Sequence, residues 1–188
     1  EYVDEAGRLW YLRYPLTEPT GGMDYLVVAT TRPETMLGDT GVAVNPKDER
    51  FAHLVGKTVR LPLVDREIPI FADYYVDSSF GTGCVKVTPS HDPNDWAMGE
   101  RAGLPRVNVF DETAHVVEGY GKFSGMDRDE AREAVVAAFE ELGLLDHVED
   151  HDHSVMTCYR CHTKLEPWES EQWFVAVDAL KKDAARVV

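Results

Sequence analysis

Five side chains that could grip a small polar molecule lie in one short stretch of the chain: Lys86, Thr88, His91, Asp92 and Asp95. Successive strand residues point to opposite faces, so a strand at residues 84–88 would place Lys86 and Thr88 on the same face. Asp92 is followed by proline, which favours a helix start, and Asp95 falls in the first turn of that helix. These residues therefore converge where a strand meets a helix N-terminus, which suits a ligand with both charge and hydroxyl groups.

A second polar cluster follows the apolar run at residues 25–29 and comprises Thr30, Thr31, Arg32, Glu34 and Thr35. Both clusters also have a purely structural explanation, because Asp92 and Asp95 favour a helix N-terminus and Pro33 favours a first helical turn. The two explanations are compatible, since a group held at the start of a helix is already oriented for a ligand. Lys86 is harder to explain structurally, because it lies between two valines with no acid at a spacing that guarantees pairing.

The elements that must position these clusters are mostly short strands. Alternating apolar residues and turn signals predict strands at residues 8–14, 25–29, 41–44, 58–63, 68–71, 84–88, 144–149, 154–158 and 172–177. The strands at residues 58–63 and 68–71 flank the polar residues 65–67, which predicts a hairpin. Helices are predicted at residues 46–54, 93–102 and 127–142, the last with a capping box formed by Asp127 and Glu130. The expected fold class is α+β, with a strongly bent sheet or β-barrel core and a few peripheral helices.

Length and composition set the broad class of the protein. We expect residues 1–188 to form a single domain with a core at about residues 20–177. Residues 1–19 and 178–188, the latter with a polar helical pattern, are expected to be connections to the rest of a longer protein, since the sequence does not begin with methionine. No apolar run approaches the roughly 20 residues that cross a membrane, so no membrane partner is expected.

Charge and cysteine content narrow the functional classes. The net charge of −15 argues against broad binding along nucleic acid, which needs clustered Lys and Arg, but not against contact with one nucleic-acid end. Three cysteines do not make a disulfide framework for 188 residues, so a reduced, cytoplasmic setting is expected.

Cys158, Cys161 and His162 match the spacing of a c-type haem attachment motif, and the two thiols could also bind zinc. Haem is disfavoured because the sequence has neither a secretion signal nor a matching haem pocket. A structural zinc needs four ligands. Cys84 and the run at residues 149–153 are the remaining candidates, but such an acidic run is typical of a solvated surface, so no complete metal site is expected in this chain.

Several ordered motifs resemble the editing domain inserted into class I valyl-tRNA synthetases, which has relatives in the isoleucyl and leucyl enzymes. These motifs are residues 29–39 (ATTRPETMLGD), 61–70 (LPLVDREIPI), 81–95 (GTGCVKVTPSHDPND), 125–128 (GMDR) and 170–175 (SEQWFV). The resemblance runs from about residue 25 to residue 177. The combination of Lys86, Thr88, Asp92 and Asp95 resembles the valyl enzymes rather than the isoleucyl or leucyl ones.

The resemblance implies post-transfer editing, the hydrolysis of mischarged threonyl-tRNA(Val). An apolar valine pocket cannot strongly reject threonine, a known property of valyl-tRNA synthetases, so a second, hydrolytic site is needed. The partners implied are the threonine-bearing 3′ end of tRNA(Val) and the rest of the synthetase chain. No cofactor is expected for editing, whereas ATP and magnesium would serve the parent enzyme, which ligates valine to tRNA(Val). Two alternatives are a non-catalytic insert that binds the tRNA acceptor end and the editing domain of the isoleucyl relative.

The predicted substrate-binding residues are Thr30, Thr31, Arg32, Glu34, Thr35, Lys86, Thr88, His91, Asp92 and Asp95, of which Asp95, Lys86 and Asp92 are also predicted to be catalytic. The resemblance assigns Asp95 to the α-ammonium group of the substrate, and Lys86, Thr88 and Asp92 are suited to read its side-chain hydroxyl. Arg32 and the neighbouring threonines would hold the terminal ribose and the carbonyl. Neither cluster holds a serine or cysteine beside an evident base, so we expect direct attack by water without a covalent intermediate.

Overall fold

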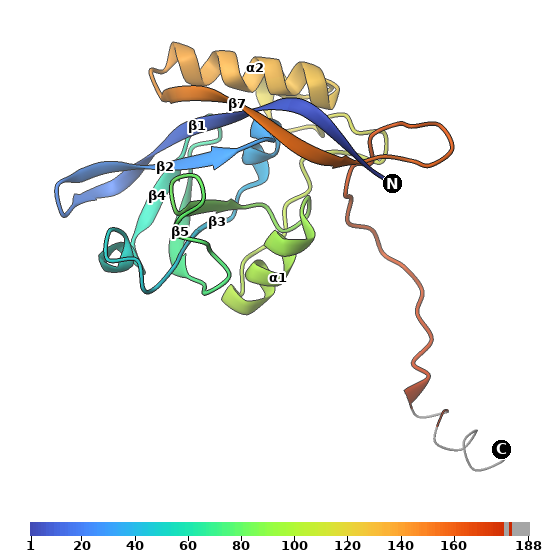
Figure 1. Ribbon diagram of the computed structural model, residues 1–188, viewed down its shortest axis with the longest axis horizontal. Helices are drawn as coiled ribbons and strands as arrows, with labels where there is room; N and C mark the ends of the chain where they lie inside the picture. The colour runs from blue at the N-terminus through green and yellow to red at the C-terminus, as the bar shows by residue number, and fades with distance from the viewer. Residues whose placement is uncertain (179–180, 182–188) are drawn as a thin grey trace.

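The computed structural model describes residues 1–178 and 181 and contains a seven-stranded sheet that curls into a nearly closed barrel (Figure 1). The strands are β1 (Tyr2–Thr20), β2 (Met23–Thr30), β3 (Gly41–Val44), β4 (Thr58–Leu61), β5 (Arg66–Ala72), β6 (Cys84–Val87) and β7 (Leu145–Met156). Their order is β2-β1-β4-β5-β3-β6, with β7 paired to β1. The two ends of this order, β2 and β6, contact each other. The predicted α+β class with a strongly bent, barrel-like sheet is confirmed.

Strand β1 organises the barrel, because it pairs with β2, β4 and β7. Its side chains alternate as a strand requires, with Leu12, Tyr14 and Leu16 buried in the core. From the sequence, residues 1–19 are expected to form a connection outside the core, whereas the structure places Tyr2–Thr20 in this longest strand. The difference arises because the pairing partner of its first half, β7, is far away in the sequence.

The two α-helices begin where the sequence predicts. Helix α1 (Pro93–Ala102) is capped by Asp92, whose side chain accepts hydrogen bonds from the first free backbone amides. Helix α2 (Arg128–Glu141) begins with the predicted capping box of Asp127 and Glu130 and lies against β7 (Figure 1). The short 3₁₀ helices are η1 (Pro33–Gly38), η2 (Ala52–Leu54) and η3 (Gly121–Phe123).

Two local predictions are wrong. Residues 46–54 form turns followed by η2 rather than one helix, because Asn45 and Asp48 accept hydrogen bonds from backbone amides two residues further on. Such side-chain bonds offer the backbone an alternative to the helix. Residues 144–149 and 154–158 do not form two strands, because β7 runs continuously between them along β1. The predicted hairpin of β4 and β5 is confirmed.

The C-terminal segment also differs from its prediction. Residues 172–177 form no strand, because no strand in the described part of the chain pairs with them. Their side chains point into solvent, with Trp173 fully exposed, and Figure 1 shows the segment leaving the body of the molecule. The helical tail predicted at residues 178–188 lies outside the described residues, except for Asp178 and Lys181. No helix in the described part of the chain is long and apolar enough to span a membrane.

Candidate functional site

Both polar clusters of the sequence line one cavity of about 620 Å³. It lies where β2, η1 and β6 meet the start of α1, with β7 forming part of its rim. The predicted site residues that line it are Thr30, Thr31, Arg32, Thr35, Lys86, Thr88, His91, Asp92 and Asp95. Arg32 and Asp95 therefore share one hollow, although they are far apart in the sequence. Glu34 does not line the cavity.

Lys86 is a buried cation at the base of the site. Its side chain on β6 is 8% exposed and donates hydrogen bonds to Thr35 Oγ1 at 2.8 Å, Thr88 Oγ1 at 2.6 Å and Asp39 Oδ1 at 3.1 Å. An ammonium group has three N–H donors, so these three acceptors use its full capacity. Lys86 thus joins both clusters by holding one hydroxyl from each.

Asp39 is the acid that pairs with Lys86, and the sequence analysis assigned it no role. Its Oδ1 also accepts from Thr88 Oγ1 at 2.6 Å, and its Oδ2 accepts from the Tyr14 hydroxyl at 2.7 Å. Burial, and then the neighbouring Asp39 carboxylate, raise the pKa of Tyr14 well above its ordinary value. The contacts of Asp39 join residues that are distant in the sequence, so no local pattern reveals them. The one signal in the sequence that could have indicated a role for Asp39 is its place as the last residue of the ATTRPETMLGD motif.

Asp95 places a carboxylate inside the cavity near this cluster. Its Oδ2 accepts a hydrogen bond from the Thr88 backbone amide at 2.8 Å, while its Oδ1 has no partner among the described residues. Burial raises the pKa of Asp95 to about 7, although the Lys86 charge and the Thr88 amide act in the opposite direction. A desolvated carboxylate with a spare oxygen is suited to bind a cation.

Asp92 combines the structural and the functional explanation. Its Oδ1 caps α1 by accepting from the amides of Asn94 at 2.7 Å and Asp95 at 3.1 Å. Its Oδ2 accepts no hydrogen bond from the described residues, and Asp92 lines the cavity. Capping fixes the carboxylate, so one oxygen remains available for a ligand.

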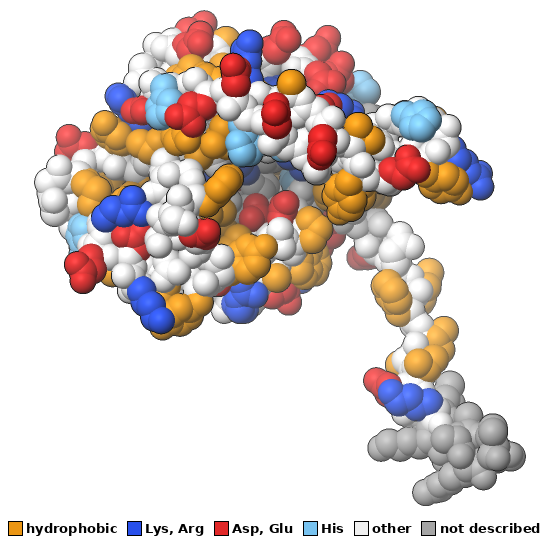
Figure 2. All heavy atoms as spheres, viewed as in Figure 1, with side chains coloured by type: hydrophobic (Ala, Val, Ile, Leu, Met, Phe, Trp, Pro, Cys, Tyr) orange, Lys and Arg blue, Asp and Glu red, His pale blue; other side chains and the backbone are white. Residues whose placement is uncertain are grey.

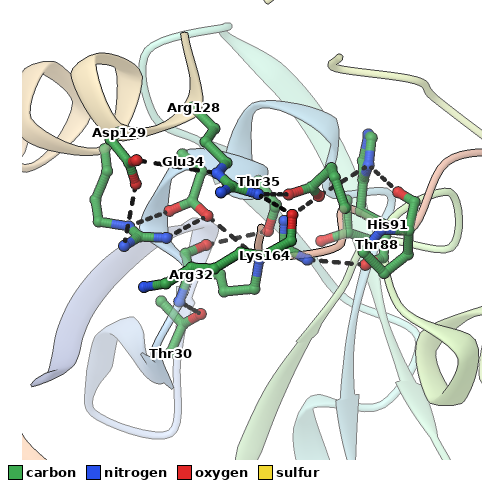
Figure 3. A network of polar contacts seen from close by, with 12 residues as sticks. Thr30, Arg32, Glu34, Thr35, Thr88, His91, Arg128, Asp129 and Lys164 are labelled. Carbon is green, nitrogen blue, oxygen red and sulfur yellow. Dashed lines mark hydrogen bonds and ion pairs between the residues drawn. The ribbon is translucent and has the colours of Figure 1, made fainter. Parts of the chain in front are cut away.

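Arg32 is held by acceptors from three different segments, and Figure 3 labels Arg32 with two of these partners, Glu34 and His91. Its Nε donates to Glu34 at 3.3 Å, its Nη1 donates to the His91 carbonyl at 3.0 Å, and its Nη2 pairs with Glu166. Glu34 is fully buried and is gripped by Arg132 through two hydrogen bonds of 2.8 and 2.9 Å. Those ion pairs lower the pKa of Glu34 against the effect of its burial. Glu34 thus supports Arg32 from behind the cavity wall.

His91 lines the cavity, but both of its ring nitrogens bond to the protein. Nδ1 lies 3.2 Å from the Pro167 carbonyl, and Nε2 accepts from the Val109 amide at 2.8 Å. These partners require a neutral ring with the proton on Nδ1. Burial lowers the pKa of His91 to about 4, in agreement with that state.

The rim of the cavity includes residues that the sequence analysis did not assign to the site. Tyr75, Phe80, His151 and His153 line it, the last two from β7. Strand alternation directs these two histidines to one face of β7 within the acidic run 149–153, which the sequence analysis interpreted as a solvated surface. Acidic side chains are spread over the face of the molecule shown in Figure 2.

Two of the cysteines differ in burial and in the pKa of their thiols. Cys84 is buried, and burial raises the pKa of its thiol to about 12. Cys161 is exposed and contacts the Thr163 hydroxyl, which lowers the pKa of its thiol. Within residues 1–178 and 181, no group of three or more His, Cys, Asp or Glu side chains is arranged to hold a metal ion.

Comparisons with known proteins show which family this chain is similar to. Residues 47–140 match the family model described as "Leucyl-tRNA synthetase, editing domain". The chain is 53% identical to the valine–tRNA ligase of Thermotoga maritima and 55% identical to that of Geobacter sulfurreducens, in each case over 100% of this chain and 21% of the relative. It is 58% identical to the ligase of Parasynechococcus marenigrum over 96% of this chain and 19% of the relative. The chain thus spans about a fifth of the length of these relatives.

Solved structures support the same fold. The structure described as GlLeuRS-CP1 matches 76% of this chain and 99% of its own, with a TM-score of 0.59 and 17% identity. A LeuRS from Agrobacterium radiobacter K84, in a ternary complex with tRNA and LeuAMS, matches 87% of this chain and 24% of its own, with a TM-score of 0.58 and 19% identity. The chain therefore belongs to the family of aminoacyl-tRNA synthetase editing domains, in its valyl-tRNA synthetase branch.

Proposed function

We propose that this chain hydrolyses the ester bond of threonine wrongly attached to tRNA(Val). The observation that carries the proposal is the position of Asp95. One of its oxygens is fixed by the Thr88 amide, and the other has no partner among the described residues inside the cavity that also holds Lys86 and Asp92. A cavity with these groups can bind a molecule that carries both an ammonium group and a hydroxyl.

Asp95 binds the α-ammonium group of the aminoacyl ester. Its burial makes the ionised carboxylate costly while the cavity holds no cation, and the pKa of about 7 expresses that cost. A bound ammonium group favours the ionised form and removes part of the cost. The attraction is strong because water is largely excluded from the carboxylate.

Thr88 and Asp92 read the side-chain hydroxyl of threonine. Thr88 Oγ1 donates to Asp39 and accepts from Lys86, which leaves one lone pair for the substrate. Asp92 contributes its free Oδ2. Lys86 acts by fixing Thr88, because its three donors are already used. Valine would leave Thr88 and Asp92 unpaired at a cost of about 1–3 kcal/mol, and this gives the pocket its preference for threonine.

Water attacks the ester carbonyl directly in this proposal. The buried Cys84, with its pKa of about 12, is a poor nucleophile, and Ser90 donates its hydroxyl proton to Glu169 outside the cavity. Arg32 has five N–H donors and uses three on the protein. The remaining donors stabilise the carbonyl oxygen as it gains negative charge, with help from a ribose hydroxyl of the substrate.

The proposal extends to the longer protein, and the similarity to valine–tRNA ligases supports it. The chain is part of a cytoplasmic synthetase that ligates valine to tRNA(Val) with ATP and magnesium, and the editing reaction itself needs no cofactor. The acidic surface limits binding to the 3′ end of the tRNA, with the synthetase body supplying the remaining affinity.

The test is a hydrolysis assay with threonyl-, valyl- and isoleucyl-charged tRNA(Val), using the full-length synthetase and the Asp95→Ala variant. We expect threonyl-tRNA to be hydrolysed fastest, and the variant to lose at least 100-fold in rate through loss of the ammonium anchor. Preferential hydrolysis of the valyl ester would indicate an isoleucyl-type domain. Binding of the tRNA end without hydrolysis by the wild type would indicate a non-catalytic insert.

A further inference from the structure

A segment near the C-terminus, residues 164–169, packs behind residues that line the cavity. Trp168 Nε1 donates to the Phe110 carbonyl at 3.1 Å, and the Lys164 carbonyl accepts from Arg128 at 3.2 Å. These contacts join it to a loop and to α2, which are distant in the sequence. The segment contains no helix and no strand of the sheet. Backbone pairing holds its start, through the Thr157–Lys164 bridge and the Leu165 amide on the Met156 carbonyl, and contacts that involve side chains hold the rest.

Glu166 is the residue of this segment that reaches Arg32. Its side chain is 12% exposed, and its Oε1 pairs with Arg32 Nη2. The same carboxylate lies 3.9 Å from His91 Nδ1 and 3.8 Å from Arg128 Nη1. The neighbouring Pro167 carbonyl bonds to the His91 ring. One short stretch of chain thus contacts two residues of the cavity wall.

The other acid beside Arg32 is already engaged. Glu34 forms two short hydrogen bonds with Arg132, and its contact with Arg32 Nε is longer, at 3.3 Å. The His91 carbonyl holds Nη1 but carries no charge. Glu166 is therefore the charged partner at the outer end of the Arg32 guanidinium. Without it, only the longer Glu34 contact and the uncharged His91 carbonyl among the described residues hold the group.

We propose that Glu166 is a positioning residue for aminoacyl ester hydrolysis, which fixes the guanidinium plane of Arg32. With Glu34, the His91 carbonyl and Glu166 each holding one nitrogen, the two N–H donors that remain have fixed directions. The Arg32 side chain is 28% exposed and lines the cavity, so those donors can meet the carbonyl or ribose of the substrate. This inference rests on the proposed function.

The test compares Glu166→Gln, Arg32→Ala and the double variant in the full-length synthetase, with threonyl-tRNA hydrolysis as the activity. Glu169→Gln is the matched control, because Glu169 lies in the same segment and bonds to Ser90 and Arg106 away from Arg32. A second readout is calorimetric binding of an amide-linked analogue of threonyl-adenosine, which cannot be hydrolysed. Thermal unfolding shows whether each variant is folded.

We expect Glu166→Gln to weaken analogue binding and to lower kcat/KM about 10- to 100-fold, as small misplacements of a binding group do. In the Arg32→Ala background the same change has an effect below about twofold, because the group that Glu166 positions is gone. Glu169→Gln stays close to wild type.

Four results would overturn the inference, the last of them together with the proposed function. Full activity and full analogue binding of Glu166→Gln would show that Arg32 is positioned without it. Equal losses with and without Arg32 would show that Glu166 acts elsewhere, and a loss of kcat that matches the loss of folded protein in thermal unfolding would indicate a smaller folded fraction only. A wild-type enzyme that neither hydrolyses threonyl-tRNA nor binds the analogue would overturn the proposed function as well.

Discussion

Lys86 Nζ lies 3.1 Å from Asp39 Oδ1, and both side chains are almost completely buried at the base of the cavity. The pair joins β6 to the residue that follows η1, so it brings the two polar clusters of the sequence together. Buried ion pairs add little net stability, but removing one partner leaves an uncompensated charge. The pair therefore ties the geometry of the site to the stability of the barrel.

Replacing Lys86 with methionine should destabilise the domain by about 3–5 kcal/mol, because the buried Asp39 carboxyl would lose its cationic partner. Denaturant unfolding of the chain measures the change. The double variant Lys86→Met/Asp39→Asn should recover most of the lost stability but no hydrolysis, since Thr35 and Thr88 lose the cation that orients them. A loss below 1 kcal/mol in the single variant would contradict this assignment.

The buried carboxyl of Asp95 should lower the free energy of unfolding at high pH, although the proposed reaction requires it. Burial raises its pKa to about 7, so the folded state is stabilised by the protonated form below the pKa of the unfolded carboxyl, and this contribution disappears as the pH rises through 7. Asp95→Asn should therefore raise the free energy of unfolding at pH 8 by roughly 2–4 kcal/mol and leave it unchanged near pH 3. Denaturant titrations at both pH values measure this. No gain at pH 8 would mean that the carboxylate is already compensated.

The same carboxyl group should shape the pH dependence of hydrolysis. Asp95 must be ionised to hold the ammonium group, so kcat/KM should fall as the pH drops below about 7. Above about pH 8 it should fall again, as the α-amino group of the substrate loses its proton. Asp92→Asn should keep the fall in kcat/KM at low pH. Asp95→Asn should hydrolyse the ester slowly, with a kcat/KM that no longer falls over that pH range.

Asp92 allows its capping role and its ligand role to be separated. Asparagine caps helices as well as aspartate does, whereas alanine costs about 1 kcal/mol. Asp92→Asn should leave thermal stability near wild type but reduce the preference for threonyl over valyl ester by about tenfold. Asp92→Ala should lose both. Unchanged selectivity in the Asn variant would show that the hydroxyl is read by other groups.

Chemical modification of the cysteines tests whether hydrolysis passes through a covalent enzyme intermediate. At pH 8 iodoacetamide should modify the exposed Cys161, whose pKa is lowered by its contact with Thr163, and spare the buried Cys84, whose pKa is raised to about 12. Mass spectrometry identifies the modified residue, and hydrolysis should continue at the wild-type rate. Trapping of a threonyl adduct on any side chain would contradict direct attack by water.

Local rules predicted much of this site from the sequence. Strand alternation placed Lys86 and Thr88 on one face, and the Asp92–proline pair located the start of α1, which brought Asp95 beside them. The same kind of reasoning predicted the hairpin of β4 and β5 and the capping box of α2. These features depend on residues a few positions apart, and so the sequence contains them directly.

Contacts between distant segments were decided by the tertiary structure. No spacing rule predicts that Lys86 pairs with Asp39 or that Glu166 reaches Arg32. Nor does one predict that both ring nitrogens of His91 bond to the protein. The first half of β1, residues 2–12, pairs with β7, a partner so far away in the sequence that no local pattern indicates it. The sequence determines the residue types of this site and their local order. Its charged side chains meet their partners only in the curled sheet, because closure of the sheet brings remote segments within hydrogen-bond distance.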